Sequence, residues 1–151
     1  MRRIRTAEYE ELQAVSDLMS RVFKGPMQED YSVEARETFL HEISLSSLQK
    51  RFFDTSVFYL ACDDAEIEGV LELEQPSHIA FLFALKQGQG IGKALCKKVI
   101  ERTMQGFVTV GAFPKAAGFY EGLGFKKVSD ENSSSHLPFV LMARHIDTAD
   151  V

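Results

Sequence analysis

A strand-like segment runs directly into a glycine-rich loop and a helix-like segment near the middle of the chain. Residues 78–85 form a short apolar run that is bounded by turn residues, which is typical of a strand buried on both faces. The loop at 86–92 contains three glycines, and the apolar residues that follow it have the spacing of one helix face. Unpaired amides and the positive end of the helix dipole therefore meet at this loop. The pattern favours an anion, such as a phosphate, bound at the junction.

Two common nucleotide-binding motifs do not fit this loop. A P-loop needs a lysine followed by serine or threonine, but Lys93 is followed by Ala94. A dinucleotide-binding fold needs the pattern Gly-x-Gly-x-x-Gly, whereas Gly88, Gly90 and Gly92 are spaced Gly-x-Gly-x-Gly. A glycine-rich helix cap without any ligand is the remaining structural alternative.

The rest of the sequence predicts an α/β fold in which a central mixed sheet is flanked by helices. Residues 1–151 are enough for one sizeable core, and no linker divides them, so we expect a single domain. Thr6 is expected to cap the first helix. The polar segment 130–135 is expected to be a mobile loop. The other expected elements are helices at 12–22, 33–43, 46–53 and 115–122, a hairpin of strands at 56–62 and 67–74, and strands at 107–110, 126–128 and 137–143.

Composition argues against several classes of partner. A net charge of −5 argues against a nucleic acid bound on a broad basic face. No apolar run approaches the ~20 residues of a membrane span, and the first residues lack the apolar region of a secretory signal. We therefore expect a cytoplasmic protein without membrane contact. Cys62 and Cys96 are expected to be small buried hydrophobic residues rather than a disulfide or part of a metal site.

Two short motifs follow one another in the second half of the chain. Gln87, Gly90 and Gly92 match the pattern Gln/Arg-x-x-Gly-x-Gly/Ala, and residues 116–125 match Ala-x-x-Phe-Tyr-x-x-Leu-Gly-Phe. In this order the two motifs resemble the signatures of the GNAT superfamily of acyl-CoA-dependent N-acyltransferases, and the resemblance covers essentially the whole chain. It implies acetyl-CoA as the cofactor and acetyl transfer to an amine.

The resemblance also implies roles for individual residues. The pyrophosphate of coenzyme A would lie on the loop amides, and the pantetheine arm would pair with backbone groups of Phe83 and Ala84. Tyr120 would lie near the thioester sulfur and protonate the departing thiolate, a task that suits a phenol. The full set of expected cofactor-binding residues is Phe83, Ala84, Gln87, Gly88, Gln89, Gly90, Ile91, Gly92, Lys93 and Phe119.

A general base for the attacking amine is harder to find. No acid, histidine or cysteine lies between Ile79 and Leu85. His78, at the start of the same strand, is the second expected catalytic residue, and Glu72 and Glu74 on the neighbouring hairpin arm are further candidates that would act through water. The alternative interpretation of His78 is a turn residue bonded to the backbone.

The sequence leaves the acceptor open. We expect a primary amine of a small molecule that attacks directly, without a covalent enzyme intermediate. The acidic segment 28–31 is either a solvated turn or an entrance that attracts a cationic amine. The alternatives are a protein or peptide amine as the acceptor and a regulatory module that binds acyl-CoA without catalysis. A homodimer is common in the family and is therefore an expected assembly.

Two positions depart from the family pattern. Only Leu85 and Lys86 separate Ala84 from Gln87, so the turn between the strand and the loop is shorter than in typical members. Gly111 stands where many relatives have an asparagine that bonds the pantetheine. We therefore expect either a shifted pyrophosphate or a narrower loop, and one fewer cofactor contact.

Overall fold

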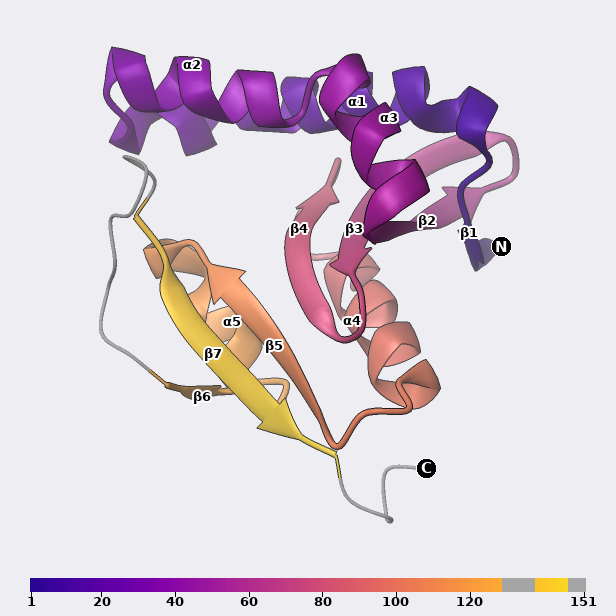
Figure 1. Cartoon of the computed structure of the whole chain (residues 1–151), viewed down its shortest axis with the longest axis vertical. Helices are drawn as coiled ribbons and strands as arrows, with labels where there is room; N and C mark the ends of the chain where they lie inside the picture. The colour runs from indigo at the N-terminus through magenta and orange to yellow at the C-terminus, as the bar shows by residue number, and fades with distance from the viewer. Residues whose placement is uncertain (129–137, 147–151) are drawn as a thin grey trace.

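Seven strands form one mixed sheet in the computed structural model, which describes residues 1–128 and 138–146 (Figure 1). Their order across the sheet is β1-β2-β3-β4-β5-β7-β6. The β4–β5 pair is parallel, and the five other neighbouring pairs are antiparallel. The strands are β1 (Arg2–Thr6), β2 (Ser56–Asp63), β3 (Glu66–Glu74), β4 (His78–Ala84), β5 (Phe107–Ala112), β6 (Lys126–Lys127) and β7 (Val140–His145).

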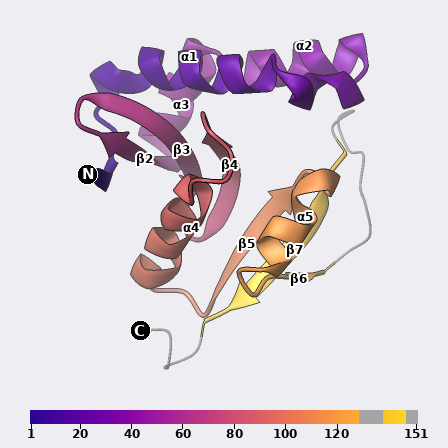
Figure 2. The same ribbon diagram turned by 180° about the vertical axis from the view of Figure 1, so that it is seen from behind.

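Helices cover both faces of this sheet. Figure 1 shows α1, α2 and α3 gathered together, and Figure 2, seen from behind, brings α4 and α5 to the front. The expected α/β class with a central mixed sheet flanked by helices is thus confirmed. The helices are α1 (Leu12–Phe23), α2 (Val33–Glu42), α3 (Leu45–Asp54), α4 (Ile91–Arg102) and α5 (Ala117–Glu121), with short 3-10 turns η1 (Tyr9–Glu11), η2 (Pro26–Asp30) and η3 (Pro114–Ala116).

Two apolar cores, one on each face of the sheet, explain the unbroken apolar run in the middle of the sequence. The α1 core contains side chains of α1, α2 and α3 together with Phe83 of β4. The α4 core contains side chains of α4 and α5 together with Ile79 of β4. Because successive residues of a strand point to opposite faces, a strand between two cores is apolar at almost every position. The expectation of a strand buried on both faces holds for Ile79 and Phe83, whereas the other residues of β4 are only partly buried.

A few local expectations need correction. Thr6 ends β1 instead of capping a helix, and Glu8 and Glu11 form a capping box at η1 before α1 begins. The last long strand begins at Val140 rather than at 137, and the expected loop at 130–135 lies outside the described residues. Cys62 and Cys96 are free and buried, as expected. Within the described residues, the structure has no helix with the length and apolar character that crossing a membrane requires.

Candidate active site

The adjacent strands β4 and β5 separate soon after they begin. Among the described residues, two pairs join them, His78 with Thr109 and Ile79 with Val110. Figure 1 shows the strands leaning apart towards their C-terminal ends, and we call this opening the split. Backbone N–H and C=O groups that line the split have no strand partner across it, so they are available to an extended ligand.

An extra residue in β4 marks the point where the split opens. Leu73 of β3 pairs with Ile79 and Glu72 pairs with Phe81, which leaves Ala80 as a β-bulge. Without the bulge, residues 79 and 81 would point to the same face. Instead, Ile79 enters the α4 core, whereas Phe81 packs against the α1 core. The bulge therefore turns Phe81 away from α4 at the mouth of the split.

The register of the β3–β4 ladder decides which backbone groups of β4 face the split. The amide of Leu85 donates a hydrogen bond to the carbonyl oxygen of Glu68 at 2.8 Å. Residues that bond to the partner strand alternate along an antiparallel ladder, so Phe83 also directs its backbone groups to β3. Leu82 and Ala84 then direct theirs to the split. This register argues against Phe83 as a source of free backbone groups and favours Leu82, which the sequence analysis missed, beside Ala84.

The glycine-rich loop opens its amides to solvent. Gly88 and Gly90 have φ values of 77° and 74°, and no atom lies within 4 Å of the position that a Cβ would take at either residue. Gly90 is the N-cap of α4 and provides no side-chain cap. Residues 86–90 and Lys93 are exposed, whereas Ile91 is buried in the α4 core. The loop thus presents free amides and a lysine, the groups that an anion requires.

Gly92 and Phe119 bring α4 and α5 together beside this loop. A Cβ on Gly92 would lie 3.3 Å from the ring of Phe119 and 3.5 Å from the side chain of Leu82. Phe119 itself remains 40% exposed. The contact places Leu82 and Phe119 next to the first turn of α4, so two of the expected motifs meet in space.

Tyr120 combines a buried ring with an available hydroxyl. Its side chain is 5% exposed, in the α4 core, and its ring packs edge-on against Phe119 and Phe125. Among the described residues, this hydroxyl has no hydrogen-bond partner, and no fully buried side-chain oxygen lacks one. The oxygen must therefore still reach solvent. Burial, with a smaller contribution from the nearby Cys96, raises the pKa of Tyr120 above its usual range, so the phenol stays protonated at neutral pH.

Two of the three candidate bases, His78 and Glu72, are held by other residues, and Glu74 is exposed on β3 opposite His78. His78 lies in the paired part of β4, where Nδ1 is 2.8 Å from the hydroxyl of Thr109. Burial lowers the pKa of His78, and the neighbouring charge of Glu74 opposes this shift. Glu72 is 0% exposed and accepts hydrogen bonds from Arg51 at 2.6 and 3.0 Å and from Ser56 at 2.7 Å. These hydrogen bonds hold the carboxylate in place.

A set of aromatic rings borders the split on the α1-core side, and the sequence analysis missed it. Tyr31, which lies between η2 and α2, is 5.9 Å from Phe113, which follows β5, measured between ring centroids. Phe39 of α2 lies 5.7 Å from Phe113 and 5.5 Å from Phe81. These rings come from separate segments, and the only sequence signal was the content of 12 phenylalanines without tryptophan.

A basic groove of about 470 Å³ adjoins the loop on the side of the sheet that α4 and α5 cover. It lies between α4 and the turn 122–124 and is lined by Lys93, Lys97, Arg144 and the acidic Glu101. Lys97 and Lys93 are one helical turn apart on α4, so their ammonium groups extend the positive potential that begins at the loop amides. This groove suits the exposed, anionic part of a ligand whose other end enters the split.

Replacing Gly90 by alanine should lower both the folding stability of the protein and the affinity of the loop for an anion. The left-handed φ of Gly90 makes a side chain cost about 1 kcal/mol of folding stability. The new methyl group would also stand over the amides and weaken anion binding. Thermal unfolding and titration with coenzyme A measure the two effects. Gly118→Ala is the matched control, because Gly118 is helical with no atom near its Cβ position, and we expect unchanged binding and a gain of about 0.5–1 kcal/mol.

Comparisons with known proteins agree with this geometry. The model of the family described as "Acetyltransferase (GNAT) domain" matches residues 27–146. No curated protein is significantly similar to the chain. Among solved structures, the PaiA N-acetyltransferase from Thermoplasma acidophilum in complex with coenzyme A superposes with a TM-score of 0.79, at 19% identity over 96% of this chain and 99% of that one.

Two further structures are similar in fold and differ in what their names say they act on. A spermidine N-acetyltransferase chimera from Vibrio cholerae and hSSAT has a TM-score of 0.69 at 15% identity, covering 95% of each chain. A ribosomal-protein-alanine N-acetyltransferase from Escherichia coli has a TM-score of 0.71 at 15% identity, covering 98% of this chain and 96% of that one. At these identities the likeness establishes the fold.

Proposed function

Because the chain belongs to the GNAT acetyltransferase family, we propose that it transfers the acetyl group of acetyl-CoA to a primary amine of a small molecule by direct attack, with Tyr120 as the general acid. The observation that carries this proposal is the Tyr120 hydroxyl, which reaches solvent without a hydrogen-bond partner among the described residues although its ring is buried. A structural tyrosine in a core normally bonds its hydroxyl to a neighbour, so a free phenol is available for another task.

The residues around the split fit the acetyl donor along its length. The open amides of Gly88, Gly90 and the first turn of α4, with Lys93 and Lys97, would hold the phosphates. Leu82 and Ala84 would pair their backbone groups with the amide-rich pantetheine arm. The donor supplies an acetyl group that is already activated as a thioester.

The chain itself has one proton to provide in this reaction. A new C–N bond forms to the amine nitrogen while the C–S bond breaks, and the Tyr120 hydroxyl gives its proton to the departing sulfur. Tyr120 then recovers a proton from water. The attacking nitrogen loses its proton to solvent, since Glu72 is held by Arg51 and His78 is bonded to Thr109. The value of kcat/KM should therefore rise with pH towards the pKa of the acceptor.

The test is turnover by the unmodified protein. A panel of small amines is supplied with acetyl-CoA, and free thiol and acetylated amine are measured together. The proposal requires thiol release that depends on the amine and equals the acetylated product. Amine-independent thiol release at the background rate with every amine would contradict it.

A binding module without catalysis is the second candidate. The structure gives one specific reason for it, namely that Glu72 is bonded to Arg51, His78 is bonded to Thr109, and Glu74 lies on β3, which does not border the split. Tight binding of acetyl-CoA, together with absence of turnover across the whole panel, would favour this alternative.

A further inference from the structure

We propose that the acceptor is a small primary amine with a single positive charge and an aromatic or apolar body, recognised by the rim rings Tyr31, Phe81 and Phe113. This inference rests on the acetyl transfer proposed above and names the class of its acceptor. The carrying observation is that these three rings belong to the α1 core, on the face opposite Tyr120, where the carboxylates of Asp30 and Glu72 already have cationic partners.

The acceptor would approach the split from the side away from α4 and α5. The loop amides, the basic groove and Tyr120 all lie with α4 and α5, so an acetyl donor held by them occupies that side of the sheet. An amine must then reach the thioester from the other side. On that side, Phe81 and Phe113 pack against the α1 core at the two edges of the split, and Tyr31 belongs to the same core.

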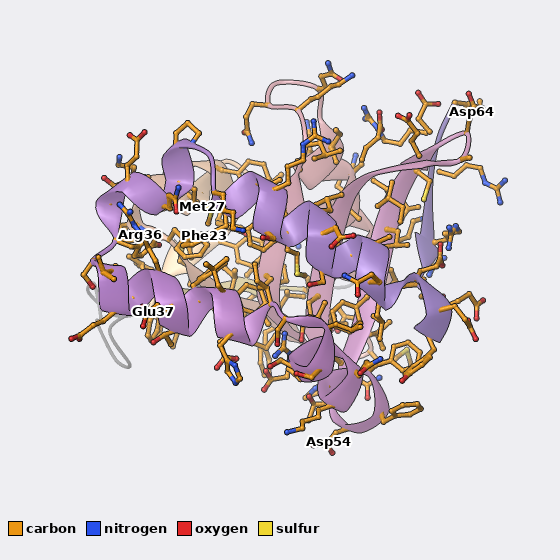
Figure 3. All side chains as sticks on the ribbon, turned by 90° about the horizontal axis from the view of Figure 1, so that it is seen from above. Phe23, Met27, Arg36, Glu37, Asp54 and Asp64 are labelled. Carbon is orange, nitrogen blue, oxygen red and sulfur yellow. The ribbon has the colours of Figure 1, made fainter. Side chains whose placement is uncertain are left out.

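The rim rings rest on other aromatic rings that are buried behind them. Phe23 stacks on Phe39 with centroids 4.1 Å apart, and Phe39 meets both Phe81 and Phe113. Figure 3, seen from above, shows Phe23 between α1 and α2. The buried rings hold the rim rings in place. Aromatic surfaces that are fixed in this way favour flat apolar groups, and the faces of their rings attract organic cations.

The charges around the rim rings favour an amine with one positive charge. Asp30, the acid nearest to Tyr31 in sequence, forms an ion pair of 2.6 Å with Lys115, and Glu29 also acts on that lysine. The guanidinium of Arg51 lies 5.7 Å from the centroid of Phe81, and its charge is shared with the buried Glu72. Several ammonium groups of a polyamine would have to compete with Lys115 and approach Arg51. A single amine on an apolar body avoids both costs.

Tyr31 adds a polar group to this surface. Among the described residues its hydroxyl has no hydrogen-bond partner, and burial, reinforced by the charge of Asp30, raises the pKa of Tyr31 to about 12. The phenol therefore stays neutral and offers a hydrogen bond at the edge of the aromatic surface. A neutral hydroxyl, which can donate and accept a hydrogen bond, suits a single amine or hydroxyl group of the substrate better than several ammonium groups.

The experiment measures amine binding apart from chemistry. The full chain is saturated with free coenzyme A, which has no acetyl group to transfer, and is titrated with 2-phenylethylamine and with spermidine by calorimetry. We expect 2-phenylethylamine to bind at least about tenfold more tightly. Tighter binding of spermidine, or binding of neither amine, would overturn the inference.

Variants assign the preference to the rim rings. Phe113→Leu keeps an apolar side chain for folding and should weaken 2-phenylethylamine binding about five- to tenfold, while coenzyme A binding stays unchanged. Tyr31→Leu is the second variant, in case Phe113→Leu lowers stability. Phe53→Leu is the matched control, because Phe53 is 76% exposed on α3 and packs with Tyr9 and Phe52 instead. Unchanged binding in both rim variants would overturn the assignment.

Failure of this inference is distinguishable from failure of the proposed function. Selective binding of 2-phenylethylamine without any turnover from acetyl-CoA would support the rim rings and contradict the acetyl transfer. Efficient turnover with spermidine in preference to 2-phenylethylamine would do the reverse. Lys115→Met supplies one more comparison, since it frees Asp30 and should improve spermidine binding relative to the unmodified protein.

Discussion

The Tyr120→Phe variant should lose about 100-fold or more in kcat while it binds acetyl-CoA as tightly as the unmodified protein. General acid catalysis by a positioned side chain typically contributes about 100- to 10,000-fold. The hydroxyl has no hydrogen-bond partner among the described residues, so its removal breaks no bond within them and should leave the melting temperature nearly unchanged. Steady-state kinetics, calorimetry with coenzyme A and thermal unfolding measure the three quantities on one preparation.

Tyr59→Phe is the matched control for this variant. Tyr59 is another largely buried tyrosine, but it lies on β2 under the guanidinium of Arg102 and faces a separate cavity near the end of α4. Its loss should leave kcat unchanged. If Tyr120→Phe kept full activity, another group would have to protonate the sulfur, and the free hydroxyl would need a different explanation.

The largest effect on stability should come from Arg51→Met, with an expected loss of about 3–5 kcal/mol in the free energy of unfolding. Glu72 is fully buried and takes two of its three side-chain hydrogen bonds from Arg51. Arg51 also donates to the carbonyl oxygen of Glu42 at the end of α2, so its loss loosens α2 and α3 from β3. Urea-induced unfolding of the two proteins at neutral pH gives the difference directly.

Two further variants show whether the uncompensated charge is the cause. Lys50 lies at an exposed position of the same helix, so Lys50→Met should change the free energy of unfolding by less than about 0.5 kcal/mol. The double variant Arg51→Met/Glu72→Leu removes both charges and should recover most of the loss, since a buried ion pair can often be replaced by apolar groups. A double variant as unstable as Arg51→Met alone would place the cost in lost packing instead.

Elements with a local signal were predicted well from the sequence. The hairpin expected at 56–62 and 67–74 is β2 and β3, and the first helix follows the expected apolar stripe. These elements depend on the spacing of apolar residues and on turn residues. Both signals can be read from a few neighbouring positions of the sequence. The two motifs likewise placed the glycine loop and Tyr120 on the chain, and the fold brings their surroundings together through Gly92 and Phe119.

What the sequence could not predict depends on partners that are distant along the chain. Ala80 lies inside a continuous apolar run, so nothing marks it as a bulge, yet it decides that Phe81 faces the α1 core. Glu72 looked like a candidate base because its partner Arg51, 21 positions away, belongs to another element. Leu82 was missed because the direction of a backbone group depends on the ladder register, which only the paired strands reveal.

The brief pairing of β4 with β5 has a mechanical consequence. Strands β1–β4 and strands β5–β7 are two half-sheets that share a short seam of two residue pairs. A ligand arm bonded to Leu82 and Ala84 would lie along the gap and act as a substitute for the missing ladder. Amide hydrogens of the second half-sheet should then exchange more slowly when coenzyme A is present, and the whole domain should unfold more cooperatively.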